Sequence, residues 1–159
     1  MSVIGTLITD RIRADADRVV ELATKGWKAM TAAERNEWLS SEKGSYNAAD
    51  LNRVGEAMFY VMDLLNAYGY SVTITPRTDW TMGEIPEPDE LQHYLDDVAT
   101  LRAILKLPPS TPAVPSDMDG LTFEEANDIE RILLDIDRML SNIAAAWFYS
   151  GEIYAGEFT

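Results

Sequence analysis

The chain has 159 residues, 47% of them hydrophobic and 25% charged, which is the size and composition of one folded domain. The absence of cysteine excludes disulfides and thiolate chemistry, and no apolar run approaches the roughly 18 residues of a membrane span. The net charge of −14 disfavours nucleic acid and anionic lipid as partners, and it is uneven: residues 1–80 carry 11 acids and 9 bases, whereas residues 81–159 carry 16 acids and 4 bases. Because the N-terminus also lacks a signal-peptide pattern, these features indicate a protein made in a reducing cytoplasm.

Residues 1–46 predict one or two short helices. The first runs from Asp10 to Lys25, is capped by Thr9 or Asp10, and ends at Gly26. The second opens at a capping box formed by Thr31 and Glu34 and continues to about residue 41.

Residues 47–147 predict three longer helices. They begin near Asn47, a good N-cap, at Pro88, which suits a first helical turn, and at Thr122, which forms a second capping box with Glu125. Along each helix the apolar residues recur in steps of three and four, which places them on one face. Three such faces of similar length predict a helical bundle within a single, mainly α domain.

Two connectors have their own patterns. Residues 71–75 are β-branched and alternating, and they are candidates for a small β-ribbon with residues 3–8 or with the C-terminal tail. The proline-rich residues 108–115 are long enough to cross the bundle.

An Asp-x-x-Arg pattern recurs on three predicted helices and favours ion pairs on helix surfaces, with a shared docking feature as the alternative. The three pairs are Asp15 with Arg18, Asp50 with Arg53, and Asp128 with Arg131.

No catalytic signature is present. His93 is the only histidine, it lies in a predicted helix, and no serine or cysteine nucleophile motif accompanies it. Two acidic pairs, Asp96 with Asp97 and Glu124 with Glu125, are neighbours in predicted helices. Neighbouring side chains of a helix point about 100° apart, so neither pair converges on a metal. We therefore expect no catalytic residues, no metal and no cofactor, and a protein that is not an enzyme.

The last residues, 148–159, form an extended, aromatic tail with a tandem five-residue repeat. Its large side chains, Tyr149, Ile153, Tyr154 and Phe158, are the predicted partner-binding residues, since a chain end is usually polar. Whether the tail packs on its own domain or on another chain is left open by the sequence. Two further partner-binding candidates are Trp80 and Trp147, with core anchoring as the alternative. Trp80 lies in a loop, and the preceding helix directs Trp147 towards the body of the bundle.

Five segments, in this order, resemble a group of small proteins encoded by phages and prophages of Gram-positive bacteria, and segments at the ends of larger tail-associated proteins there. The segments are 25–31 (KGWKAMT), 46–54 (YNAADLNRV), 78–81 (TDWT), 121–122 (LT) with 126–130 (ANDIE), and 147–152 (WFYSGE).

The resemblance implies a virion structural component of the tail or baseplate, made in the host cytoplasm. Its partners would be other phage structural proteins or further copies of itself, and not nucleic acid or membrane. The acidic second half, with its net charge of −12, motivates a different hypothesis, an acidic phage-encoded inhibitor that mimics DNA and binds a basic host protein.

Overall fold

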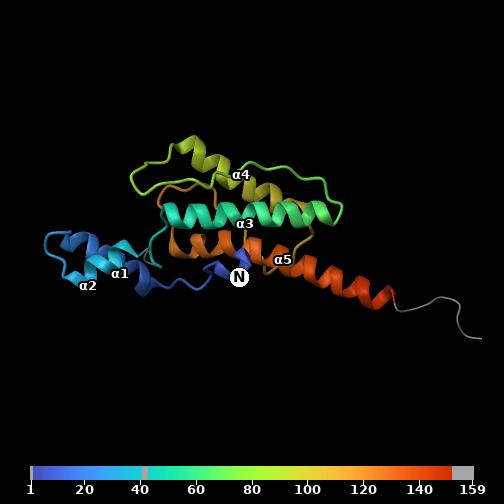
Figure 1. Ribbon diagram of the computed structural model, residues 1–159, viewed down its shortest axis with the longest axis horizontal. Coiled ribbons are helices and arrows are strands. Elements are labelled where there is room, and N and C mark those ends of the chain that lie inside the picture. Colours follow the sequence, from blue (N-terminus) through green and yellow to red (C-terminus); the bar gives the residue numbers. More distant parts are fainter. Residues whose placement is uncertain (1, 41–42, 152–159) are drawn as a thin grey trace, which may run out of the picture.

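The computed structural model (Figure 1) describes the backbone of residues 2–40 and 43–151, and the side chains of these residues as far as Trp147. This part of the chain is mainly α-helical, as the sequence predicts. Its elements are the 3-10 helix η1 (Val3–Thr6) and the α-helices α1 (Arg13–Lys25), α2 (Ala32–Leu39), α3 (Ala48–Ala67), α4 (Pro88–Ile104) and α5 (Phe123–Gly151).

Helices α1 and α2 pack together as a hairpin at one end of the molecule (Figure 1). The chain leaves α1 at Gly26, whose φ of 72° lies in the region that favours glycine. Two ion pairs join the helices: Arg18 Nη2 lies 2.8 Å from Glu37, and Lys25 Nζ lies 2.7 Å from Glu34. Few large side chains of the hairpin are buried, so ion pairs contribute much of its specificity.

The predicted cap of the first helix is wrong. Helix α1 begins at Arg13, and the Asp15 carboxylate accepts the N–H of Ile12 at 2.9 Å. The reason lies upstream, where the backbone N–H groups of Ile8 and Arg11 donate to Glu130 and Asn127 on α5. This tether holds residues 8–11 in an extended path, so the helix starts later. The other predicted starts, at Thr31, Asn47, Pro88 and Thr122, are confirmed.

Helices α3, α4 and α5 pack against one another and run in the same direction, with their N-termini towards the hairpin (Figure 1). Side-chain bonds fix the parallel register of α3 and α5. Arg53 reaches Glu130 at 2.8 Å, and seven residues further along both helices Tyr60 donates to Asp137 at 3.1 Å. Parallel neighbours require long return connections, and these are residues 68–87 and 105–122.

The core lies between these three helices. The predicted apolar faces are buried along most of their length, with Val54, Val98 and Leu133 fully inaccessible. Burial of each such side chain contributes about 1.5–3 kcal/mol. The exceptions lie at the far ends, where Tyr68 is 40% and Trp147 78% exposed.

The first return connection contains the predicted ribbon segment, which forms no strand. Val72, Ile74 and Pro76 alternate towards the core, so the segment is extended as expected. However, its backbone is bound by side chains of α3, because Asn66 both donates to and accepts from Val72, at 2.9 Å each.

Residues 3–8 are no strand partner either, since Val3–Thr6 is a 3-10 helix packed on α3 and α5. No strand occurs in residues 2–40 and 43–151, so the ribbon prediction is wrong for them; pairing with the tail lies outside the described residues.

The second return connection crosses from α4 to α5, as the prolines predict. Arg102 on α4 donates to the carbonyl of Pro112 at 2.7 Å, and the Thr111 hydroxyl donates to Asp135 on α5 at 2.7 Å. The connector therefore closes one side of the bundle.

Helix α5 extends well past α3 and α4 (Figure 1). Among the side chains of α5 that the structure describes, the last fully buried one is Leu140, and residues 145–147 are exposed. Trp147 therefore lies outside the core, contrary to the expectation that it belongs to the body of the bundle. The reason is length, because α5 has 29 residues whereas α3 has 20 and α4 has 17.

Candidate functional site

A buried ionic cluster joins the N-terminal segment to α3 and α5. Arg11 Nη2 lies 2.9 Å from Asp50 and 2.7 Å from Glu130, and Arg53 Nη2 lies 2.6 Å and 2.8 Å from the same two carboxylates. Arg11, Asp50 and Glu130 are almost inaccessible. Two cations and two anions balance, and a buried carboxylate is stable only when it is paired in this way. Glu130 also accepts the backbone N–H of Ile8, so the cluster holds the N-terminal segment in place.

The ion pair that the Asp-x-x-Arg pattern predicts between Asp50 and Arg53 forms at 2.6 Å, but the prediction that it lies on the surface is wrong, because the Asp50 side chain is buried. The prediction is also wrong for Asp15, because Arg18 pairs with Glu21 and Glu37 instead. A surface pair and a buried pair have the same spacing, and only the approach of Arg11 and Glu130 distinguishes them.

Two tyrosines connect this cluster to the end of α4. The hydroxyls of Tyr46 and Tyr94 are hydrogen-bonded to each other, and the Arg11 guanidinium lies 5.6 Å from the Tyr46 ring centroid. Burial raises the pKa of both hydroxyls well above the ordinary tyrosine range. Neither therefore ionises near neutral pH, and the pair acts as a packed polar contact.

Trp80 lies beside this pair, and the structure brings it into the core with 5% of its surface exposed. Its backbone N–H and carbonyl are both bound by the amide of Asn52 on α3, at 2.8 and 2.9 Å. The Arg77 guanidinium covers the indole at 4.1 Å from the centroid, a cation–π contact. The indole N–H is buried and donates to no group in the described part of the chain.

Arg77 is held in turn by three acids. Its nitrogens lie 2.7 Å from Asp79, 2.6 Å from Glu84 and 3.1 Å from Glu90. The hydrogen bonds to Asp79 and Glu84 raise the pKa of Arg77 and keep the side chain charged. This arrangement fixes the loop after Trp80 against the first turn of α4.

Cavities lie on both sides of Trp80. One, of about 300 Å³, lies between residues 76–80 and α4 and is almost wholly apolar, with Tyr94 and Pro76 in its wall. The other, of about 210 Å³, lies between α3 and the loop, with Leu51 and Met82 in its wall. Ligand pockets for drug-sized molecules span about 300–1,000 Å³, so the first cavity reaches the lower end of that range, whereas the second suits a single side chain or a small group.

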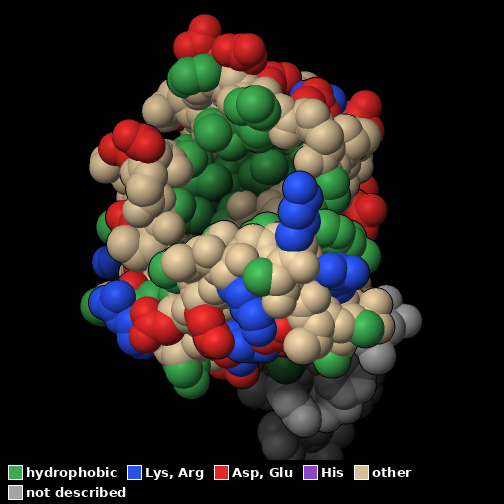
Figure 2. Space-filling view, turned by 90° about the vertical axis from the view of Figure 1, so that its left-hand side faces the viewer, with side chains coloured by type: hydrophobic (Ala, Val, Ile, Leu, Met, Phe, Trp, Pro, Cys, Tyr) green, Lys and Arg blue, Asp and Glu red, His purple; other side chains and the backbone are tan. Residues whose placement is uncertain are grey.

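The second cavity continues towards the hairpin. A further space of about 140 Å³ shares Met82 and Asn47 with it and is walled by Trp38 and Val19 of α2 and α1. We call the two spaces together the Met82 hollow. Figure 2 shows a hollow lined with hydrophobic side chains at this end of the molecule, with acidic side chains above it and both basic and acidic ones below.

His93 lines the cavity beside Trp80 and contacts Thr75 Oγ1 at 3.0 Å and Asp97 at 3.6 Å. Among residues 2–40 and 43–151, no cluster of three His, Asp or Glu side chains could hold a metal ion. The arrangement can hold an apolar side chain in a rigid, partly charged setting.

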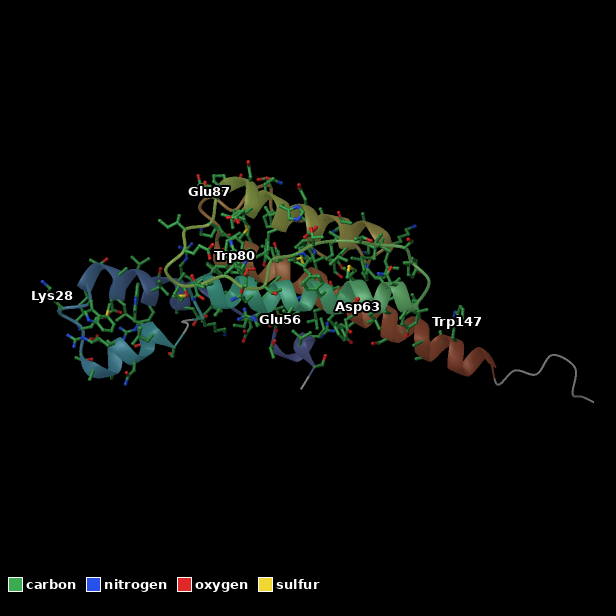
Figure 3. The ribbon with its side chains drawn as sticks, turned by 45° about the horizontal axis from the view of Figure 1, so that its top comes forward. Lys28, Glu56, Asp63, Trp80, Glu87 and Trp147 are labelled. Carbon is green, nitrogen blue, oxygen red and sulfur yellow. The ribbon has the colours of Figure 1, made fainter. Side chains whose placement is uncertain are left out.

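The predicted partner-binding residues are not brought together. Trp80 is buried beside the first half of α3 and Trp147 is exposed near the end of α5, and Figure 3 labels them well apart. The Tyr149 side chain and residues Ile153, Tyr154 and Phe158 lie outside the described residues. The sequence analysis missed the Met82 hollow, because nothing in the sequence places α2 opposite residues 81–86.

None of the helices in the described part of the chain combines the length and apolarity that crossing a membrane requires. No protein-family model, curated protein or solved structure matches the chain.

Proposed function

We propose that this chain is a non-enzymatic structural component of a phage particle, at the tail or baseplate, that acts through protein–protein contacts. The bundle of three long helices is the body, and the extension of α5 with the aromatic tail is the contact element. The observation that carries the proposal is the end of α5, which projects past the core and leaves Trp147 78% exposed just before the aromatic repeat. Exposed aromatic side chains grouped on one element are typical of interaction sites.

The charge of the described surface favours this function over DNA mimicry. In the acidic second half, Glu84 and Glu90 are already paired with Arg77. Glu130 is buried in the ionic cluster. An acidic inhibitor would need a line of unpaired carboxylates spaced like phosphates.

The test is whether the protein is part of the particle. We expect mass spectrometry of purified virions from the encoding phage to detect it at a fixed ratio to other structural proteins. Recovery from the infected cell as a complex with a basic host protein, sensitive to salt and absent from virions, would favour the inhibitor instead.

A second test concerns the contact element. Deleting residues 148–159 should leave the circular dichroism spectrum and the unfolding free energy nearly unchanged, because residues 145–147, just before the deletion, already lie exposed beyond the buried Leu140. The same deletion should abolish incorporation into particles. Loss of folding on deletion would show that the tail completes the core, against this proposal.

A further inference from the structure

We propose that the Met82 hollow receives the aromatic tail, residues 148–159, of a second copy of this chain. The copies would then associate head to tail, with the end of α5 of one at the hairpin end of the next. This inference rests on the proposed function, and it adds the surface on which the tail is received.

The hollow has the chemistry of a receptor for aromatic side chains. Its floor holds Trp80, and its rim holds Trp38 and Met82, which are 37% and 73% exposed. Methionine is flexible and polarizable and makes favourable contacts with aromatic rings, so it adapts to an incoming side chain. The separate spaces of about 210 and 140 Å³ match a segment that presents successive rings better than one large ligand.

The charge of the hollow does not oppose an acidic tail. The tail carries Glu152 and Glu157 and no base. Among the described residues that line the hollow, Glu84 is the one charged side chain, and Arg77 neutralises it at 2.6 Å. The lining therefore presents no net charge to the carboxylates of the tail.

The tail cannot reach the hollow of its own chain. Asp50 lies in the first turn of α3, near the hollow, and it shares an arginine partner with Glu130 of α5, so Glu130 lies level with the hollow. Helix α5 continues for 21 residues from Glu130 to Gly151. At about 1.5 Å per residue, the end of α5 is therefore roughly 32 Å from Glu130. Fully extended, the chain from Gly151 to Phe158 spans at most about 25 Å. A tail seated in the hollow must therefore come from another copy.

Such a contact joins two different surfaces, so each copy keeps one free hollow and one free tail. A contact of this kind closes into a ring or continues as a filament. Repeated along an assembly, a weak single contact becomes strong through avidity.

The test uses full-length variants and analytical ultracentrifugation over a wide concentration range. The hollow variant is Met82→Glu, and the tail variant combines Tyr154→Ser with Phe158→Ser. The matched control is Ile85→Glu, in the same loop but 88% exposed and outside the walls of the hollow. We expect the wild type and the control to self-associate, and the hollow and tail variants each to associate about tenfold or more weakly.

Mixing the two defective variants tests the pairing itself. The hollow variant keeps an intact tail and the tail variant keeps an intact hollow, so the mixture should form heterodimers and nothing larger. This also shows that each variant is folded, since each must supply one working surface.

Three results would overturn the inference: a wild type that stays monomeric, a hollow variant that associates like the wild type, or a control that is as defective as the hollow variant. None of these removes the proposed function, which is judged by presence in the particle. Absence from the particle together with tail-to-hollow association would instead leave this inference standing alone.

Discussion

At the scale of single residues, Glu130 is the side chain on which the N-terminal part of the fold depends. It is fully buried and accepts hydrogen bonds from Arg11, Arg53 and the N–H of Ile8. Three elements far apart in the sequence therefore meet at one carboxylate. Its sequence context, in the middle of a helix rich in acids, resembles that of a solvated glutamate.

We expect Glu130→Gln to lower the unfolding free energy by about 3–5 kcal/mol, because Arg11 is then left buried without its full charge balance. Urea unfolding followed by circular dichroism measures this. Glu56→Gln, an exposed site on α3 labelled in Figure 3, is the control and should change stability by less than about 0.5 kcal/mol. Equal losses in both variants would show that the cluster does not stabilise the fold.

Asp97 gives a pH-dependent prediction at the same scale. Burial raises the pKa of this carboxyl above its ordinary 3.8, while His93 and the N–H of Thr75 oppose the shift. The native state therefore keeps a proton that the unfolded chain has released, and this group's contribution to stability falls as pH rises through that window.

Asp97→Asn removes this titration. We expect the variant to gain stability relative to the wild type as the pH rises from the ordinary pKa of an aspartate, 3.8, through the raised pKa of Asp97. At higher pH the difference in stability between the two proteins should stay constant. Urea unfolding at a series of pH values measures the difference, and Asp63→Asn, at an exposed site on α3, serves as the control. A difference that shrinks with rising pH would contradict the assignment.

At the scale of elements, α3 acts as a binding surface for the return segment. Asn52 and Asn66 hold the backbone at Trp80 and Val72, and Gly55 lies between them. A Cβ on Gly55 would lie 2.7 Å from the Arg77 carbonyl oxygen, so only glycine permits this approach. The segment is extended like a strand, yet helix side chains replace the neighbouring strand.

We expect Asn52→Ala to cost about 1–3 kcal/mol, because two backbone groups of Trp80 lose their partners. The backbone amide of Trp80 should also exchange with deuterium faster. A general loss of stability would speed exchange throughout the protein, whereas loss of the Asn52 contact should speed it in this segment alone. Asn142→Ala, on the exposed part of α5, is the matched control and should be neutral. Unchanged exchange at Trp80 would show that Asn52 does not hold the loop.

At the scale of the whole molecule, the parallel helices gather their N-termini at one end. The first turns of α3, α4 and α5 all carry acids, including Asp50, Asp89 and Glu124, which interact favourably with the positive ends of the helix dipoles. The more neutral hairpin is joined to this end at Gly44, whose Cβ position lies 2.0 Å from the Asp15 carbonyl oxygen. One close backbone contact therefore sets where the hairpin lies and shapes the Met82 hollow.

We expect Gly44→Ala to lower the unfolding free energy by about 1–3 kcal/mol, because the added methyl group displaces α1. Gly83→Ala is the matched control, since a Cβ there meets nothing within 4 Å. That change should be neutral or stabilise by about 0.4–1 kcal/mol through the unfolded state. Differential scanning calorimetry on both variants measures the contrast, and an undisturbed Gly44→Ala variant would refute the close contact.

The sequence by itself determined the α-helices, the starting residues of all of them but the first, and most of their buried faces, because capping boxes and steps of three and four are local signals. It also showed the aromatic tail and the uneven charge. The tertiary structure decided the parallel direction of the three helices, the pairing of Asp50 with Arg11, and the burial of Trp80. Each of these depends on residues far apart in the sequence coming together, and the spacing within one helix contains no information about the side chain that will meet it from another.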